Sequence, residues 1–283
     1  MYSNGGYYSN LQFAPYAQYN GQNYPQTQPA VRYDRMQITP PAQESDNPAK
    51  TAGMALLLQG MTVMLDKGSG FLSRKFMRGK EFTTFENIEK VAKHMTAKNK
   101  LGVEIGFIDH TNLDKYVKRF GEATRGAFTE VADGKNAFFS DVLNLCVAPK
   151  SKPSLLPHEL GHATAAAKKG ILNLMRKSKY AAVYAPMVLL LASKIAGPKE
   201  DGSPNFIERN AGVLGFCAYL PKVIEEAAAS IRGYMGSKEA LKGLGKTINY
   251  APLRNNYLVA LGTYVLGAIA VGIASKQMII NNK

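Results

Sequence analysis

Three residues near the middle of the chain have the types and spacing of a metal-dependent hydrolase site. His158, Glu159 and His162 stand in the stretch LLPHELGHATAAAKKG. Residues four apart lie on one face of a helix, so both histidines can direct a ring nitrogen at one zinc ion. Glu159 would lie beside that ion, where its carboxylate can take a proton from a metal-held water and pass it to a leaving amine. The pattern predicts a zinc site on a helix, with Gly161 letting a neighbouring backbone approach.

A zinc site of this kind needs a third protein ligand, and the sequence limits where it can be. No histidine follows His162, and the 40 positions after Glu159 contain no acidic residue. Glu225 and Glu226 stand in LPKVIEEAAASIRGY, beside apolar and small residues. A carboxylate pair there costs desolvation free energy unless a cation compensates it. Either glutamate fits this argument, with Arg232 as a second partner. The other late acids stand in loops or among charges, which is typical of solvated carboxylates: Glu200, Asp201, Glu208 and Glu239.

The stretches PHELGHA and EEAAASIRGY together resemble the gluzincin peptidases. From Leu155 to Ile273 the chain looks most like the YugP-type membrane zinc metallopeptidases, and more distantly like the HtpX-type peptidases. In those families the first residue of an E-x-x-A-S or E-x-x-A-D element binds zinc, and the stretch from Glu226 to Ser230 matches that register. The resemblance therefore implies Glu226 as the third ligand, Zn2+ as the cofactor and peptide-bond hydrolysis as the activity.

The residue that would stabilise the oxyanion stays open, with Arg232, Tyr234 and His110 as candidates. His110, in FIDHTN, is more typical of a cap or loop histidine, and His94 of a surface or packing histidine. The stretch NAFF at 136–139 is similar to the edge strand that precedes the zinc helix in HtpX-type enzymes. Such a strand can bind an extended peptide by adding it to the sheet.

Periodicity upstream of the histidines predicts the elements that would position them. Residues 84–98 have a helical pattern, 101–109 alternate as a strand, and TNLDKYVKRFG predicts a short helix that ends at Gly121. Two β-rich runs around DGK at 133–135 predict a hairpin. Ser151 or Ser154 is expected to cap the zinc helix. Further elements and groups are predicted as follows: an apolar helix at 51–65, and buried free thiols at Cys146 and Cys217.

Three long uncharged stretches follow the histidines. They run over fourteen residues from Tyr180, twelve from Asn210 and twenty-one from Asn255. Only the last has the length of a membrane span, about 20 residues, so we expect a transmembrane helix at 257–275. The flanks nearest the histidines and the glutamate pair are basic, whereas the loop between the first two stretches is mixed in charge. This is the positive-inside pattern, and it favours the inner membrane with the active site on the cytoplasmic side.

The amino-acid composition changes along the chain and indicates how the chain is divided into domains. Residues 1–50 are rich in Tyr, Asn, Gln and Pro and read as a disordered tail, so the net charge of +14 belongs to the rest. We expect an α+β zincin-like domain at 51–179, with a small mixed sheet and the HExxH helix, followed by an apolar helical hairpin and a transmembrane helix at 180–283.

No nucleic-acid motif is visible in the sequence. The predicted function is a membrane-associated zinc endopeptidase with peptide or protein substrates, membrane proteins among them, and with membrane lipid as a partner. The alternatives are a degenerate zinc-binding membrane scaffold, or a basic surface or nucleic-acid binder in which the HExxH pattern is accidental.

Overall fold

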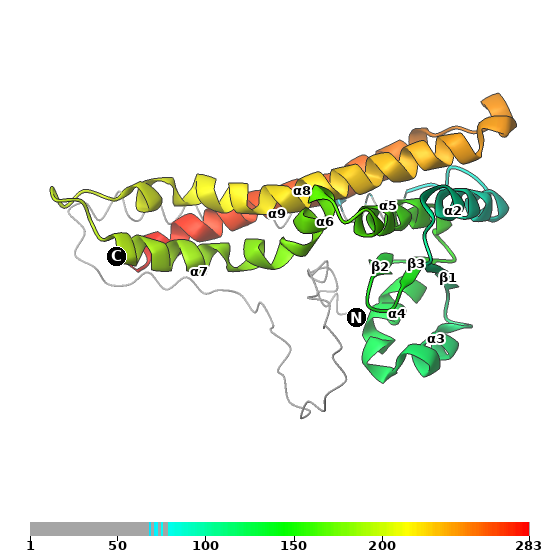
Figure 1. Ribbon diagram of the computed structural model, residues 1–283, viewed down its shortest axis with the longest axis horizontal. Helices are drawn as coiled ribbons and strands as arrows, with labels where there is room; N and C mark the ends of the chain where they lie inside the picture. Colours follow the sequence, from blue (N-terminus) through cyan, green and yellow to red (C-terminus); the bar gives the residue numbers. More distant parts are fainter. Residues whose placement is uncertain (1–67, 69–70, 73–74, 76–78, 283) are drawn as a thin grey trace, which may run out of the picture.

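The computed structural model describes residues 79–282 and, before them, residues 68, 71, 72 and 75. The described chain is mostly helical, with a small mixed sheet, and it divides into a lobe and a long helical arm (Figure 1). The predicted tail at 1–50 and the predicted helix at 51–65 lie outside the described residues. The lobe contains α2 (Phe85–Asn99), β1 (Glu104–Ile108), α3 (Leu113–Phe120), α4 (Arg125–Ala132), β2 (Phe138–Ser140), β3 (Leu145–Pro149) and α5 (Leu156–Ala167). After α6 (Ile171–Lys177), the arm contains α7 (Lys179–Ala196), α8 (Phe206–Ala240) and α9 (Ala251–Ile280).

The sheet has β3 at its centre, in the order β1-β3-β2. β1 pairs with β3 in parallel, and β2 pairs with it antiparallel. Every residue of β3 is buried, because Leu145 and Val147 pack towards α3 and α4 while Cys146 and Ala148 join the cluster around α2 and α5. A strand covered on both faces reads as a continuous apolar run. The strand predicted at 101–109 is confirmed as β1, and the stretch predicted as an edge strand contains β2, which lies at the edge of the sheet.

The predicted hairpin exists, but its turn was placed wrongly. Residues around DGK do not join two strands, because α4 occupies 125–132 and Gly134 follows it with a φ of +74°. The strands are joined instead at 141–144, where Asn144 has a φ of 49°. Phe128 and Val131 are both fully buried, three residues apart, on the inner face of this helix. Their packing against the sheet outweighs the weak strand preference of the β-branched residues in the segment.

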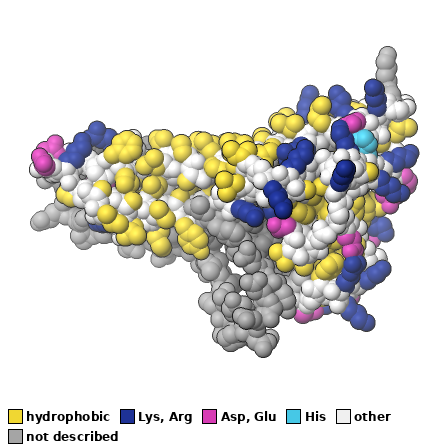
Figure 2. Space-filling view, viewed as in Figure 1, with side chains coloured by type: hydrophobic (Ala, Val, Ile, Leu, Met, Phe, Trp, Pro, Cys, Tyr) yellow, Lys and Arg dark blue, Asp and Glu magenta, His cyan; other side chains and the backbone are white. Residues whose placement is uncertain are grey.

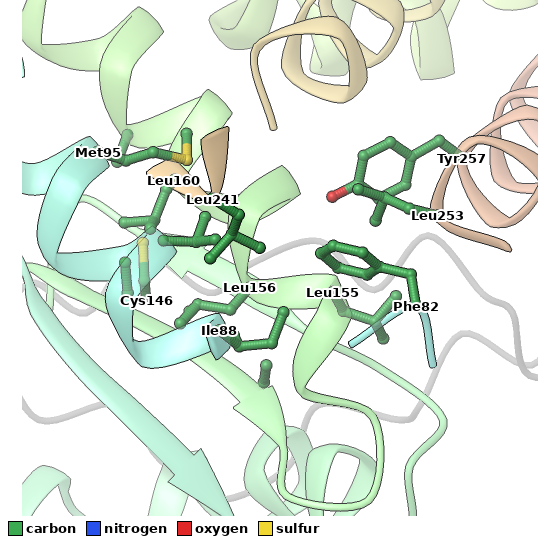
Figure 3. Close-up of a cluster of buried hydrophobic side chains, with 14 residues drawn as sticks. Phe82, Ile88, Met95, Cys146, Leu155, Leu156, Leu160, Leu241, Leu253 and Tyr257 are labelled. Carbon is green, nitrogen blue, oxygen red and sulfur yellow. The ribbon is translucent and has the colours of Figure 1, made fainter. Parts of the chain in front are cut away.

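The main core of the lobe lies between α2, α5 and β3 (Figure 3). Ile88 on α2 and Leu156 and Leu160 on α5 are completely buried there. Leu241, just after α8, and Leu253, near the start of α9, enter the same cluster. The basal ends of two arm helices are therefore anchored in the lobe.

The beginning of α5 differs from the prediction at its cap. Neither predicted serine caps the helix, since a short 3-10 turn (Pro153–Leu155) leads directly into it and Leu155 occupies the N-cap position. The Ser154 hydroxyl donates a hydrogen bond of 2.9 Å to Glu81, and its backbone N–H donates another of 3.0 Å to the same carboxylate. Pro157 lies in the first turn, as expected, because the N–H it lacks has no partner there.

The arm is a bundle in which α7 and α8 form a hairpin and α9 runs beside both (Figure 1). Asn205 and Glu208 form a capping box at the start of α8, which then continues for 35 residues through the predicted apolar stretch and the glutamate pair. α9 has 30 residues and is long and apolar enough to span a membrane. Cys146 is buried as predicted, but the prediction for Cys217 is wrong, because that thiol is exposed on α8.

Candidate metal centre

The histidine helix α5 and the glutamate helix α8 cross with almost no space between their backbones. A Cβ atom on Gly161 would lie 2.4 Å from the carbonyl oxygen of Ala229, and one on Gly233 would lie 2.7 Å from that of Pro157. Such distances exclude any side chain larger than hydrogen unless the backbone shifts. The predicted role of Gly161 is confirmed, and Gly233 plays the reciprocal part on α8. This crossing brings residues separated by more than sixty positions into one site.

Three potential ligand atoms converge at the crossing. His158 Nε2 lies 3.0 Å from His162 Nε2 and 3.2 Å from Glu226 Oε2, and the last two atoms are 3.4 Å apart. In a tetrahedral zinc site with bonds of about 2.0–2.1 Å, the ligand atoms are separated by about 3.3 Å. The triangle therefore has the size that such an ion requires. Its donor set of two imidazoles and one carboxylate suits zinc, and other divalent transition metals accept it too.

The remaining nitrogen of each histidine has its own partner. His162 Nδ1 lies 2.5 Å from Glu225 Oε1, and His158 Nδ1 lies 3.1 Å from Ser230 Oγ. If each Nδ1 carries the hydrogen and donates it outward, each Nε2 keeps its lone pair for a metal. The geometry thus separates the two glutamates, since Glu226 faces both Nε2 atoms and Glu225 orients one histidine from behind. The two carboxylates that the residue types alone left equivalent have different positions.

A partly buried lysine that sequence reasoning missed compensates the glutamate pair. Lys222 forms an ion pair with Glu226 Oε1, and its ammonium lies 3.5 Å from Glu225 Oε2. The Tyr264 ring lies under the same ammonium, 5.3 Å away, and its hydroxyl is hydrogen-bonded to Glu226. Glu226 thus has one oxygen towards the histidines and the other towards a cation. Lys222 stands four residues before Glu226, a helical spacing that could have suggested the pair.

Glu159 lies beside the ligand triangle, as the spacing predicts. One of its carboxylate oxygens is within 4.8 Å of a ring nitrogen of both His158 and His162. The side chain is buried, and this burial raises its pKa, although the two histidines oppose the shift. A carboxyl whose pKa is raised towards neutrality can accept a proton and release it again, which is the property a general base and acid requires.

The electrostatics of the cluster favour a cation between the two helices. Burial by itself would lower the pKa of His162, but Glu226 and Glu225 outweigh it and raise that pKa to about 10. Without a metal, the carboxylates therefore hold a proton on this imidazole at neutral pH. A divalent ion would replace that proton and bring more charge to the same carboxylates.

The contacts of the other predicted residues, as far as the structure describes them, do not include the three ligand atoms of the triangle. Arg232 is partly buried and donates a hydrogen bond of 3.4 Å to the Gly161 carbonyl, so it contacts α5 but not the glutamate pair. Tyr234 packs with Tyr250 in the lobe core, with ring centroids 6.1 Å apart. His110 is exposed and lies 3.1 Å from an oxygen of Asp133. His94, predicted as a surface or packing histidine, is half-buried and lies 3.5 Å from Glu239.

One further aromatic residue, which the sequence did not single out, contacts the centre. The Tyr257 ring, from the start of α9, lies with its centroid 5.5 Å from that of His158, and its hydroxyl donates a hydrogen bond of 3.4 Å to the Ser154 carbonyl.

Comparison with protein-family models, with curated proteins and with solved structures found no match for the chain.

Proposed function

We propose that the protein is a zinc-dependent, membrane-associated endopeptidase of the gluzincin type, similar to the YugP-type peptidases. His158, His162 and Glu226 would hold the metal, and Glu159 would carry the proton. The observation that carries the proposal is the ligand triangle, whose edges are 3.0, 3.2 and 3.4 Å long. The Glu159 carboxylate lies beside this triangle and is not one of its three ligand groups. A site that only neutralised buried charge would not need that further acid at this position.

The proposed reaction is hydrolysis of a peptide bond. Zinc, when bound, would polarise the scissile carbonyl and lower the pKa of a water to about 7. The Glu159 carboxylate would accept a proton from the attacking water and deliver it to the leaving nitrogen, a task that its raised pKa suits. Glu225 and Ser230 would keep both imidazole rings oriented through Nδ1. Arg232 and Tyr234 stay candidates for the oxyanion stabiliser, and Arg232, which contacts α5, is favoured.

The proposed location and substrates of the enzyme rest on the distribution of charged and apolar residues along the chain. α9 supports membrane association, and the basic flanks of the arm support the inner membrane with the active site on the cytoplasmic side. Peptides or proteins near that surface, membrane proteins included, would be the substrates, with anionic lipid as a partner of the basic lobe. Nucleic acid has no part in this proposal.

Measurement of cleavage and of metal content on the same samples tests the proposal. We expect purified full-length protein to bind about one zinc per chain and to cleave a fluorogenic peptide library. Glu159→Gln should lower the cleavage rate by about 10²–10⁴-fold while it retains zinc, because proton transfer is lost and the ligands are intact. His162→Ala should lose both. The matched control is Glu89→Gln, at an exposed position of α2, and it should change neither. Zinc-loaded protein that cleaves no peptide in the library would contradict an endopeptidase, and full cleavage by Glu159→Gln would contradict the proposed role of Glu159 in proton transfer.

A zinc-binding membrane scaffold without catalysis is the second candidate, and burial favours it. The histidine side chains are 13% and 10% exposed and those of the two glutamates 3% and 1%, so a closed structural ion would fit the same triangle. Structural zinc sites have four protein ligands, whereas this triangle has three. The scaffold predicts one zinc per chain, no cleavage, and a loss of stability when zinc is removed that Glu159→Gln does not alter.

A further inference from the structure

The long helix α8 has its large apolar residues on the outside. Its exposed side chains include Phe206, Val213, Ile224, Ile231 and Met235, which are spaced by close to whole numbers of helical turns and so form a single stripe. Its buried positions are occupied instead by small or polar residues: Ala211, Gly215, Tyr219, Glu225, Glu226, Ala229, Ser230, Gly233 and Ser237. A helix that faces water has the opposite arrangement.

The other two arm helices repeat this arrangement. On α7 the side chains of Tyr184, Met187 and Leu191 are exposed, whereas Ala182 and Ala185 are buried. On α9 Leu258 and Val265 are exposed, whereas Ala268, Gly272 and Ser275 are buried. Small residues at helix contacts with large apolar ones outside are typical of helices that associate in lipid, where burial of apolar side chains gives no advantage.

Glycines bring α8 and α9 together along the arm. A Cβ atom on Gly272 would lie 2.7 Å from the Gly212 carbonyl oxygen, and one on Gly215 would lie 2.1 Å from Ser275 Oγ. The Ser275 hydroxyl donates to the Val271 carbonyl within its own helix, so it needs no water. The two helices therefore meet through their backbones, and the bulky side chains of the arm face its surroundings.

The length of the apolar arm matches a bilayer. From Phe206 to Glu226 the helix α8 rises by about 30 Å, which is about the thickness of the hydrocarbon core. α7, with 18 residues, is about 27 Å long, and the uncharged part of α9 reaches about 31 Å. Lys222 lies within the α8 segment, but its ammonium is turned inward to Glu226 and its side chain is only 15% exposed. The exposed charges that the structure describes within these lengths, Arg209 on α8 and Lys194 on α7, lie in the turns next to the loop that joins the two helices.

Charged residues gather at both ends of the arm and leave the middle clear. Figure 2 shows one face, on which a belt of hydrophobic side chains separates a charged tip from the charged lobe. At the tip, the Lys276 ammonium donates to the Glu208 carbonyl at 2.8 Å, and Lys194 donates to the Asn282 carbonyl. Glu200 and Asp201 lie in the exposed loop between α7 and α8. At the other end the flanks are basic.

We infer that α7, α8 and α9 cross the bilayer together as one three-helix bundle, although α9 alone among the described helices is both long enough and apolar enough to be taken for a span by itself. The loop at 197–205 then emerges on the face opposite the lobe, and the metal centre lies at the boundary between lipid and water on the lobe side. The inference concerns the surface of the arm, so it goes beyond the proposed function and depends on neither metal nor catalysis. A second copy of the chain on the same face is the rival occupant. Lipid is favoured because all three helices are apolar outside and the charges lie only at the two ends.

The membrane crossing can be tested by determining on which side of the bilayer each of two engineered thiols lies. The variant Lys118→Cys/Glu200→Cys/Cys217→Ala places one thiol on the lobe and one in the loop, both at exposed positions, while Cys146 stays buried. The chain is reconstituted into vesicles of phosphatidylcholine and phosphatidylglycerol and treated with a polyethylene-glycol maleimide that cannot cross the bilayer. We expect one tag per chain, whichever way each molecule is inserted, and two tags once detergent opens the vesicles. Chains with two tags or with none in sealed vesicles would place both thiols on one side and overturn the inference.

Cys217, exposed between Val213 and Ile224, supplies a second readout in the unaltered chain. A thiol in the hydrocarbon core is out of contact with a water-soluble reagent, so we expect no reaction with a small charged maleimide in vesicles and full reaction after denaturation in dodecyl sulfate. The Cys217→Ala chain is the control and should carry no tag in vesicles. Rapid labelling of Cys217 in vesicles would show a water-facing arm, and an oxidative cross-link between two copies through Cys217 would show a dimer face. The labelling would overturn the crossing, the cross-link would overturn lipid as the occupant of this face, and neither result would affect the test of peptide cleavage.

Discussion

The lobe and the arm use apolar residues in opposite ways. In the lobe, Ile88, Leu156 and Leu160 are completely buried between a sheet and two helices. In the arm, Val213 and Leu191 are exposed, and the interior consists mostly of alanine, glycine and serine, together with Tyr219 and the glutamate pair. The difference teaches that the two regions are packed by different means, because the lobe removes apolar surface from water and the arm brings its helices together by close backbone contact. The candidate metal centre lies at the junction and takes its histidines from the lobe helix and its glutamates from the arm.

The largest effect on stability should come from a truncation in the lobe that has no counterpart in the arm. Ile88→Ala removes a completely buried side chain and should lower the free energy of unfolding by about 2–5 kcal/mol. Val213→Ala, on the outer face of α8, should change it by about 0.5 kcal/mol or less. Denaturant titration in a mild detergent, followed by circular dichroism, measures both. Equal losses would mean that the outer face of the arm is packed against protein, and the comparison would fail.

The junction between the two regions should be sensitive to a single methyl group. Gly161→Ala places a Cβ atom 2.4 Å from the Ala229 carbonyl, so α5 and α8 must move apart. We expect a loss of about 1–3 kcal/mol in stability and weaker zinc binding. Gly126→Ala is the matched control in α4, because no atom lies within 4 Å of the added methyl, and it should keep or raise stability by up to about 1 kcal/mol. Calorimetric unfolding with and without zinc distinguishes the two, and an equally stable Gly161→Ala protein would show that the helices are not in tight contact.

The residues behind the histidines should tune metal affinity without removing the site. Glu225→Gln keeps the shape of the side chain but removes the charge that faces His162 Nδ1, so zinc affinity should fall by about 10–100-fold. Ser230→Ala removes the partner of His158 and should cost less, because a neutral hydroxyl is the weaker partner. Competition with a chromophoric chelator gives both dissociation constants. If Glu225→Gln abolished zinc binding as completely as Glu226→Gln, then Glu225 would be a ligand and the assignment of the two glutamates would be reversed.

The smallest effect concerns pH. Without metal the pKa of His162 is raised from its ordinary 6.5 to about 10, so the stabilisation from its ion pairs is complete below pH 6.5 and is lost as pH rises towards 10. Zinc needs the neutral imidazole, so binding should release a proton between pH 7 and 9, and apparent affinity should rise up to about tenfold per pH unit. Calorimetric titration in two buffers of different ionisation enthalpy counts the proton. Zinc uptake without proton release would show that His162 is neutral in the metal-free protein.

Sequence patterns predicted much of the lobe and missed one segment. The helices at α2 and α3 and the strand β1 were predicted because their periodicity is strong and local, and α3 ends at Gly121 as expected. The segment of α4 was taken for a strand because Val131 and its neighbours favour β-structure. Its helical face becomes evident only once the sheet is present for Phe128 to pack against.

The candidate site was predicted in unequal parts. Helical spacing alone placed His158 and His162 on one face, with Glu159 beside them, since residues four apart are neighbours on any helix. Residue types alone left Glu225 and Glu226 equivalent, and the resemblance to known peptidases favoured Glu226, which is the one that faces both Nε2 atoms. Zinc was expected to compensate the pair, with Arg232 as a second partner, and the expectation for Arg232 is wrong, because the side chain that contacts the pair is Lys222.

By itself, the sequence determined the histidine pair, the uncharged lengths of the arm and the basic flanks, because these depend on spacing along one chain. Only the tertiary structure decided which glutamate meets the histidines and which face of α8 is left outside. Both depend on the crossing of α5 and α8, where Gly161 and Gly233 let two backbones touch across about seventy residues of intervening chain. The outward position of the bulky residues follows from the same close packing, since only small side chains fit between helices so near to one another.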